Sequence, residues 1–529
     1  MKEITQTRLI IFTALFFVLF DNVSFFTNVT AVYPFITTNI GFLISLAVIL
    51  VAFIILLFSM FSSKYTTKPI LISTLLVSSI TSYFMNSYYV IIDDSMIRNT
   101  FQTNLSESSD LFTMTLLYYL IFLGILPSWF VYKAKILYRP FTKEIVSKII
   151  AIVLSIVIIV IMLFSFSKFY TSFFREHKPL RYYTNPTYWI YSIGNYINKT
   201  FSTGTIIVQQ IGLDATITQD SSDKKKLVIM VVGETARADR FSLNGYEKDT
   251  NPLLEKENVV NFPNMYSCGT STADSVPCMF SKFDRVDFDY KKGIAYENVL
   301  DVLEHTKKVD IVWRDNNSNS KGVAQRIGEV SFRTSENNTV CDVECRDIGM
   351  IVGLDKYVAE HKDKNILIVL HHMGNHGPAY YKRYTKEFEK FTPVCKTNQV
   401  EKCTVEEISN AYDNAILYTD FFLSRVINFL KPYSKDHETA MIYMSDHGES
   451  LGENGIYLHG MPYFMAPEEQ KHIPSIMWFG KNDTINVEKL KSYSNNEYSH
   501  DNLFDTLLGF FDVKTKVYNK DKDILYNAK

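Results

Sequence analysis

The chain has 529 residues, which is too long for one ordinary domain. Its formal net charge is only −2, so it lacks the basic surplus of a nucleic-acid-binding protein. Hydrophobic residues make up 47% of the sequence and concentrate in its first third, whereas the remainder has the composition of a soluble globular domain.

Five apolar segments in the first third are each close to the roughly 20 residues that a transmembrane helix needs. They cover 9–33, 39–62, 68–91, 111–132 and 149–170. Five such runs with short polar breaks disfavour the alternative of buried helices in a soluble protein. The first run carries Asp21 and Asn22 and lacks a clear small-residue cleavage site, which favours a retained helix over a signal peptide. We predict a transmembrane domain of five helices over 1–170.

Loop charge predicts the orientation, because cytoplasmic loops carry an excess of lysine and arginine. The cationic residues are Lys2, Arg8, Lys64, Lys68, Lys133, Lys135, Arg139, Lys143 and Lys148, whereas the loop at 92–110 is mainly acidic. The N-terminus is therefore expected in the cytoplasm, and everything after about residue 170 outside it.

All six cysteines follow the last predicted span, as the near neighbours Cys268 and Cys278, Cys341 and Cys345, and Cys395 and Cys403. In an oxidising compartment this even count indicates three local disulfides, although six cysteines allow 15 connectivities. A zinc cluster fits less well, since no pair has the usual Cys-x2-Cys spacing.

Residues 171–222 read as a connector between two domains. Tyrosines, a tryptophan and cations alternate there, a mixture typical of a membrane–water interface, although an ordinary packed linker is also consistent. From residue 223 onward the pattern is that of a globular domain. Short apolar runs at 227–232, 309–313, 366–370, 440–444 and 473–479 are separated by helical stretches such as 296–307 and 404–431. This alternation predicts an α/β fold with a mainly parallel sheet covered by helices.

Potential metal ligands follow several of these predicted strands. Glu234 follows the first, His371, His372 and His376 follow the third, and Asp446 with His447 follows the fourth. Because parallel strands bring their carboxyl ends to one edge, these groups are expected to meet there. Carboxylate oxygens together with imidazole nitrogens suit zinc or a similar transition metal.

A hydroxyl-rich segment bounded by Cys268 and Cys278 supplies a candidate nucleophile. A serine or threonine hydroxyl becomes a good nucleophile only when a base or a metal lowers its pKa. Composition alone leaves four candidates: Thr270, Ser271, Thr272 and Ser275.

Four motifs together resemble the lipid A phosphoethanolamine transferases, the family that includes the mobile colistin-resistance enzymes. They are GETARADR at 233–240, CGTSTADSVPC at 268–278, HMGNHGP at 372–378 and SDHGESLGENG at 445–455. The resemblance covers essentially the whole chain. It implies a membrane domain at 1–170, an interfacial connector at 171–222 and an alkaline-phosphatase- or sulfatase-like catalytic domain at 223–529. It also implies a multi-pass protein of the bacterial inner membrane whose catalytic domain lies in the periplasm.

Carried over by motif position, the resemblance implies a zinc ion held by Glu234, Thr272, Asp446 and His447, with Thr272 as the nucleophile. His376 and His459 would bind substrate phosphate or a second zinc and assist proton transfer. The remaining expected substrate contacts are Ser318, Lys321, Asn99, Thr103 and Glu107. Without the resemblance, the last three would read as a solvated interfacial helix. Two departures are the close spacing of Cys341 and Cys345 and the presence of His372 where many relatives carry Gln.

The implied reaction moves phosphoethanolamine from phosphatidylethanolamine to a lipid A phosphate through a threonine intermediate, which lowers surface negative charge and confers polymyxin resistance. The expected partners are these two lipids and the bilayer, and the expected state is a monomer. Alternatives are another periplasmic acceptor such as core oligosaccharide, a sulfatase, and a glycerol-phosphate polymerase. A different class is a membrane sensor or transporter with a periplasmic binding domain.

Overall fold

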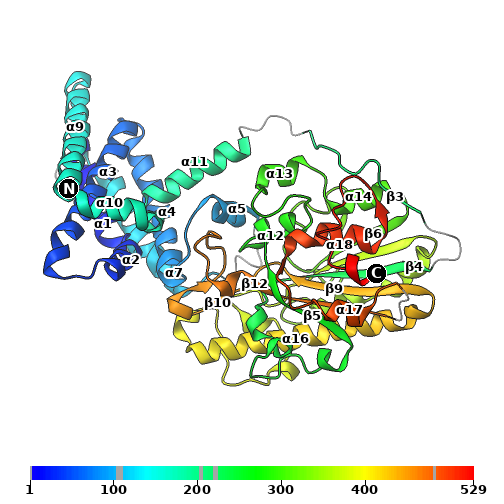
Figure 1. The fold of residues 1–529 in the computed structure, drawn as a ribbon. Coiled ribbons are helices and arrows are strands. Elements are labelled where there is room, and N and C mark those ends of the chain that lie inside the picture. The colour runs from blue at the N-terminus through cyan, green and yellow to red at the C-terminus, as the bar shows by residue number, and fades with distance from the viewer. Residues whose placement is uncertain (1–2, 103–110, 202–206, 219–223, 481–483) are drawn as a thin grey trace. The chain divides into compact units, whose positions relative to one another are not determined.

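The computed structural model describes residues 3–102, 111–201, 207–218, 224–480 and 484–529 (Figure 1). The chain divides into two compact units. One comprises Met1–Ile97 with Phe112–Asn198, and the other comprises Arg98–Leu111 with Lys199–Lys529. The first boundary between the two units falls within helix α5 (Asp94–Gln102), after Ile97.

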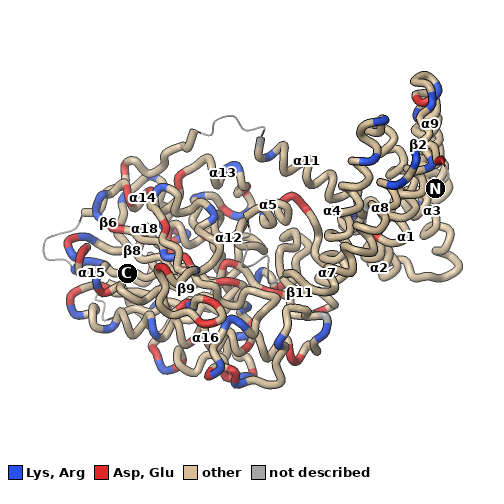
Figure 2. Tube along the Cα trace, turned by 180° about the vertical axis from the view of Figure 1, so that it is seen from behind, with Lys and Arg blue, Asp and Glu red and all other residues tan. Residues whose placement is uncertain are grey.

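The first unit consists of apolar helices. Four of its helical segments in the described part of the chain are long and apolar enough to cross a membrane, and the bent pair α1 and α2 makes a fifth if it counts as one span. The segments are α1 (Gln6–Phe20), α2 (Val23–Val32), α3 (Thr37–Phe61), α4 (Thr67–Ser87), Met114–Lys133 and α9 (Phe141–Ser165). Most of the trace of α1, α3 and α7 is uncharged (Figure 2). Large apolar side chains remain exposed on α9, where Phe164 is 79% exposed, as expected of a lipid-facing surface.

Met114–Lys133 is not a uniform helix. It consists of α7 (Met114–Tyr119), a π-helical turn η1 (Leu120–Ile125) and α8 (Leu126–Lys133). After α9 the unit continues through α10 (Ser167–Glu176), which begins four residues before the predicted connector at 171–222, into α11 (Thr187–Phe201), which lies within it.

The break between α1 and α2 falls at the two polar residues of the first predicted span. The Asn22 amide donates to Phe17 O at 2.9 Å, and its oxygen accepts from Asn185 N at 2.9 Å. Asp21 accepts from the Ser82 hydroxyl at 2.9 Å. Side chains thus satisfy the backbone where the helical ladder stops, so a 55° bend is tolerated inside an apolar unit.

The second unit is built on an eight-stranded sheet in the order β13-β5-β12-β9-β4-β8-β6-β7. The bounds are β4 (Lys225–Gly233), β5 (Val259–Tyr266), β6 (Val309–Asp315), β7 (Glu329–Ser331), β8 (Asn365–His371), β9 (His437–Ser445), β12 (His472–Phe479) and β13 (Tyr498–Ser499). All five predicted runs are strands of this sheet. Strand β12 is antiparallel to both its neighbours, so the sheet is mixed and mainly parallel.

Register brings the carboxyl ends of the central strands to one edge. Gly233 of β4 pairs with Ser445 of β9, and His371 of β8 pairs with Asp315 of β6. Strand β5 runs in the same direction as β4. Both β5 and β9 are antiparallel to β12, so β5 runs in the direction of β9, and β9 is parallel to β4. The loop that follows β5 therefore starts at the same edge.

Helices cover both faces of the sheet (Figure 1). Alternate β4 residues Val228, Met230 and Val232 belong to a core cluster shared with α12 (Thr272–Met279), α14 (Val299–His305) and α18 (Leu503–Phe510). The opposite face packs on the buried helix α16 (Val405–Leu430), whose start has a capping box between Thr404 and Glu407. Shorter helices are α13 (Tyr290–Ala295), α15 (Leu354–Glu360) and α17 (Val487–Lys491). Two short strand pairs complete the described part of this unit: β3 (Thr216–Ile217) with β14 (Val513–Lys514), and β10 (Ser450–Leu451) with β11 (Tyr457–Leu458). The first unit has the pair β1 (Ile4–Thr5) with β2 (Ile136–Leu137).

Candidate metal centre

Glu234 follows β4 at a point where two strands approach closely. A Cβ atom on Gly233 would lie 2.8 Å from Ser445 Cα, so only glycine fits there. The Glu234 N–H donates to His372 Nε2 at 3.0 Å, and its C=O accepts from Asn375 N at 3.1 Å. The loop after β8 thus holds the Glu234 backbone from both sides, which orients its side chain.

Asp446 and His447 are oriented by backbone groups around the end of β9. Asp446 Oδ1 accepts from Thr235 N at 3.2 Å and from His447 N at 2.7 Å. His447 Nδ1 lies 2.9 Å from Gly448 O, and a carbonyl only accepts, so Nδ1 carries the proton. The lone pair of His447 Nε2 is therefore left to face the neighbouring carboxylates, the arrangement typical of a metal-binding histidine.

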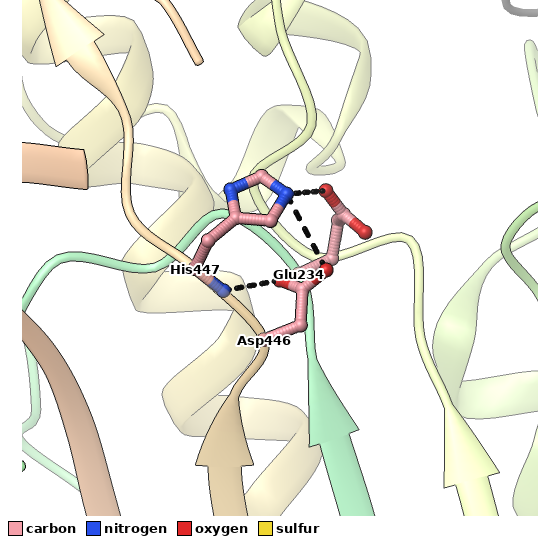
Figure 3. Close-up of side chains that lie close together, drawn as sticks. All are labelled: Glu234, Asp446 and His447. Atoms are coloured by element: carbon pink, nitrogen blue, oxygen red, sulfur yellow. Dashed lines mark hydrogen bonds and ion pairs between the residues drawn. The ribbon is translucent and has the colours of Figure 1, made fainter. Parts of the chain in front are cut away.

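The side chains of Glu234, Asp446 and His447, here called the metal cluster, converge in the interior (Figure 3). Their ligand atoms lie within 4.8 Å of one another, and all three residues are buried. Asp446 Oδ2 accepts no hydrogen bond from the described residues. Burial raises the pKa of Asp446 to about 6, and burial together with the nearby His459 lowers the pKa of His447 well below its usual range. Two buried carboxylates facing a neutral imidazole are costly without a balancing cation, and this donor set fits zinc.

Of the four candidate hydroxyls, that of Thr272 contacts side chains of the metal cluster. Thr272 is the first residue of α12, and its Oγ1 donates to Glu234 Oε2 at 3.2 Å and lies 3.4 Å from His447 Nε2. The other three hydroxyls are directed elsewhere: Thr270 to Met461 O at 2.5 Å, Ser271 to Asp274 Oδ2 at 3.2 Å, and Ser275 to Asp446 O at 2.5 Å.

Asn317 connects the metal cluster to two predicted substrate residues. Its amide donates to Glu234 Oε2 at 2.6 Å, and its Oδ1 accepts from Ser318 Oγ at 3.0 Å. Lys321 Nζ in turn donates to Ser318 Oγ at 2.6 Å. Sequence reasoning singled out Ser318 and Lys321 but missed Asn317. The available signal was its place just beyond β6, at the edge where the other ligand-type residues emerge.

Two further predicted histidines lie beside the cluster. The rings of His447 and His459 are 4.4 Å apart, and those of His459 and His376 are 5.6 Å apart. His459 Nδ1 lies 2.6 Å from Glu449 Oε2, and Glu449 Oε1 accepts from Tyr380 OH at 2.6 Å. Burial, with His459 nearby, lowers the pKa of His376 well below its usual range. Glu449 was also missed, although it stands two residues after His447 in the same motif.

His372, noted in the sequence as a departure, is part of the support for Glu234. Besides accepting the Glu234 N–H, its ring stacks on Phe422 of α16 at 5.8 Å between centroids. Burial lowers the pKa of His372 to about 4, so the ring is neutral and able to accept that hydrogen bond. The added interaction at this position is thus a hydrogen bond to the backbone.

The remaining predicted residues lie in several places. Asn99 is half-buried on α5, whereas Thr103 and Glu107 lie outside the described residues. The structure bridges Cys268 to Cys278, Cys341 to Cys345 and Cys395 to Cys403.

The mixed sheet, the strand-end metal cluster and the apolar helices define a membrane-embedded protein with a sulfatase-like domain. The family model described as Sulfatase matches residues 226–513, and the model described as Phosphoethanolamine transferase EptA/EptB matches residues 50–201. The chain belongs to the phosphoethanolamine transferase family.

Full-length relatives support this membership. The chain is 43% identical to phosphatidylethanolamine transferase Mcr-1 of Escherichia coli, over 97% of this chain and 96% of that protein. It is 36% identical to phosphoethanolamine transferase EptA of Escherichia coli K12, over 96% and 94%. Among solved structures, the integral membrane lipooligosaccharide phosphoethanolamine transferase A from Neisseria meningitidis superposes with a TM-score of 0.96 at 36% identity and covers 100% of both chains.

Proposed function

We propose that the chain transfers phosphoethanolamine from phosphatidylethanolamine to a phosphate of lipid A, with Thr272 as the nucleophile. The observation that carries this proposal is the position of the Thr272 hydroxyl, 3.2 Å from Glu234 Oε2 and 3.4 Å from His447 Nε2. Relatives of 36–43% identity are named as phosphatidylethanolamine or phosphoethanolamine transferases, which supports the transferred group.

The proposed cofactor is one zinc ion held by Glu234, Asp446, His447 and Thr272. When bound, zinc would lower the pKa of a coordinated hydroxyl and offset negative charge on the transferring phosphoryl group. The buried carboxylate oxygens and the unprotonated His447 Nε2 are the donor atoms that the chain presents for this purpose. His376 and His459 would bind substrate phosphate or a second zinc ion.

The proposed reaction has two displacements at phosphorus. Thr272 Oγ1 gives its proton to Glu234 Oε2 and attacks, a phosphorus–oxygen bond to Thr272 forms, and the bond to diacylglycerol breaks. His376 or His459 supplies the proton that the departing diacylglycerol oxygen takes up. A lipid A phosphate oxygen then gives its proton to the same histidine and attacks the phosphoethanolamine–threonine intermediate, and Thr272 Oγ1 leaves and takes its proton back from Glu234. In this scheme Glu449 holds the His459 ring through Nδ1, so the ring's other nitrogen is the one that faces the substrate.

Substrate contacts complete the proposal. Lys321 provides a compact positive charge for phosphate, and Ser318, which already accepts from its ammonium group, provides a hydroxyl beside it. Asn99, with Thr103 and Glu107, would contact the ethanolamine end.

The proposed location is the bacterial inner membrane. Residues 1–170 would span it, 171–222 would lie at its surface, and 223–529 would work in the periplasm as a monomer. A transmembrane anchor would keep the enzyme with a donor and an acceptor that both reside in membranes. Adding an ethanolamine cation lowers the negative charge of lipid A, so polymyxins should bind less well.

Mass spectrometry of lipid A from cells that express the chain tests the proposal. Wild type should add phosphoethanolamine, Thr272→Ala should not, and Thr272→Ser should retain part of the gain because it keeps a hydroxyl. Ser271→Ala is the matched control, since its hydroxyl bonds to Asp274 and lies outside the metal cluster. A gain that persists in Thr272→Ala would remove Thr272 as the nucleophile, and a gain absent from wild type would refute the acceptor.

A further inference from the structure

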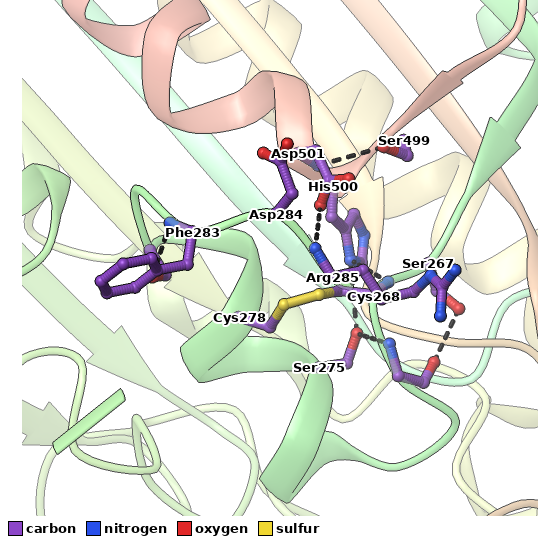
Figure 4. Close-up of a disulfide and its surroundings, with 12 residues drawn as sticks. Ser267, Cys268, Ser275, Cys278, Phe283, Asp284, Arg285, Ser499, His500 and Asp501 are labelled. Carbon is purple, nitrogen blue, oxygen red and sulfur yellow. Dashed lines mark hydrogen bonds between the residues drawn. A yellow bond between two sulfur atoms is a disulfide. The ribbon is translucent and has the colours of Figure 1, made fainter. Parts of the chain in front are cut away.

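His500 hydrogen-bonds two segments that each carry proposed metal ligands, and Figure 4 shows it beside Cys268 and Ser275 of the first segment. It begins the turn η13 (His500–Asn502) and is buried. Its Nδ1 accepts from Cys268 N at 3.0 Å, and its Nε2 lies 2.9 Å from Ser445 O. A backbone N–H only donates and a carbonyl only accepts, so the ring must be neutral with its proton on Nε2. Burial lowers the pKa of His500 to about 4, in keeping with that state.

Ser275 makes a second bridge between the same two segments. Its Oγ donates to Asp446 O at 2.5 Å and accepts from Gly269 N at 3.3 Å. The same oxygen lies 3.3 Å from His500 Nδ1, so the two bridges touch each other. Residues 267–275, here called the nucleophile loop, are therefore tied to the end of β9 twice, through side chains that bond to backbone groups.

The two bridges join segments that are distant in the sequence, the nucleophile loop and the end of β9. Thr272 belongs to the nucleophile loop, whereas His447 lies 175 residues further along the chain. Their separation in space is set by packing and hydrogen bonds, since no short covalent path joins them. The loop itself is tight, because a Cβ on Gly269 would lie 3.0 Å from Ser275 N. A displacement of the loop would therefore carry Thr272 with it.

We propose that His500, with Ser275 as its partner, is a positioning residue that holds the Thr272 hydroxyl against the metal-binding end of β9. The proposal rests on the proposed role of Thr272. It predicts an effect on the chemical step, because a reacting atom misplaced by about 1 Å costs on the order of 100-fold in rate. It predicts little effect on donor binding, because His500 and Ser275 contact backbone groups of the loop and of β9.

Three substitutions separate the two hydrogen bonds of His500. His500→Asn keeps an acceptor near the position of Nδ1, and so can keep the bond from Cys268 N. His500→Gln keeps a donor near the position of Nε2, and so can keep the bond to Ser445 O. His500→Leu keeps neither. Because the Cys268 bond is the one that reaches the nucleophile loop, His500→Asn should retain more activity than His500→Gln, and His500→Leu should retain least.

The test uses the purified full chain in detergent, with lipid A and a phosphatidylethanolamine that carries a fluorescent acyl chain. We expect kcat to fall about 100-fold in His500→Leu and about tenfold in His500→Asn, while KM for the labelled lipid changes by less than about threefold. Ser275→Ala should lower kcat about tenfold, and the double variant should lose less than the product of the single losses, since both act on one placement. His361→Leu, at a histidine after α15 whose ring hydrogen-bonds Tyr357 O one turn earlier, is the control and should retain activity.

Three results would overturn either the positioning role of His500 or the nucleophile role of Thr272. A kcat for His500→Leu within about twofold of wild type, in an enzyme that Thr272→Ala inactivates, would overturn the positioning role alone. Equal losses in the Asn, Gln and Leu variants, with parallel loss of zinc content and melting temperature, would also overturn it, because they indicate general destabilisation. Full activity of Thr272→Ala would instead overturn the proposed nucleophile.

Discussion

Replacing Asn317 with leucine removes a hydrogen bond to a proposed metal ligand while nearly preserving side-chain volume. Asn317 donates to Glu234 Oε2 at 2.6 Å and to His372 O at 3.0 Å. A hydrogen bond to a charged group contributes about 1.5–3 kcal/mol. Because about 1.4 kcal/mol corresponds to tenfold in an equilibrium constant, Asn317→Leu should weaken zinc binding by about 10- to 100-fold.

Competition with a fluorescent zinc chelator, on the purified full chain in detergent, measures this directly and needs no substrate. The matched control is Asn316→Leu. Asn316 is 1% exposed and Asn317 is 2% exposed, so both variants replace a buried amide. Asn316 donates to Cys345 O and Asp347 instead of a metal ligand. Equal zinc affinities in the two variants would refute the reasoning, because the loss would then follow general destabilisation and not the contact with Glu234.

Three further predictions concern the supports of the site and of the fold. His372→Gln keeps an acceptor for the buried Glu234 N–H and should melt close to wild type. His372→Leu keeps none, so its free energy of unfolding, measured by chemical unfolding followed by tryptophan fluorescence, should fall by about 1–3 kcal/mol. Identical unfolding curves for the two variants would contradict this. Replacing Cys395 and Cys403 with serine opens a loop of sequence separation 8 and should lower stability to guanidinium by about 2–3 kcal/mol. Reduction of wild type opens the other two disulfides as well and should therefore lower stability further; a smaller loss on reduction than in the variant would contradict this. Burial alone would raise the pKa of Asp239, but the Arg237 guanidinium holds it below its ordinary value. A carboxylate with a lowered pKa stabilises the fold above its ordinary pKa, and this stabilisation is lost as the pH falls through the lowered pKa. Arg237→Met should therefore flatten the decline in melting temperature between about pH 5 and about pH 3. An unchanged slope would argue against a contribution from the Arg237–Asp239 pair.

The strands were predictable where they are buried on both faces. Runs such as 227–232 and 440–444 are continuously apolar, and the structure places them in β4 and β9 at the centre of the sheet. Strand β5 (Val259–Tyr266) was missed because Asn261, Pro263 and Asn264 interrupt its apolar pattern. Its half-exposed alternation becomes intelligible only beside β12, to which it pairs antiparallel.

The metal cluster was predictable for a local reason. Glu234 follows β4 directly, and Asp446 with His447 follows β9, so the motif and the strand that presents it are adjacent in the sequence. The supports of these residues were not predictable in the same way. Asn317 and His372 reach Glu234 from loops that are distant in the sequence, and their contacts depend on the register of three strands.

The sequence alone therefore determined the apolar helices, the central strands and the residue types at the strand ends, because each depends on composition and periodicity over a few neighbouring residues. Composition left four hydroxyls open as the candidate nucleophile, and the motif resemblance singled out Thr272. Tertiary structure decided where each hydroxyl lies: it places Thr272 Oγ1 3.4 Å from His447 Nε2 across 175 residues of sequence, a distance set by packing and by backbone hydrogen bonds. The same packing decided that His500 and Ser275 face the backbone between these two segments, a placement that no local pattern encodes.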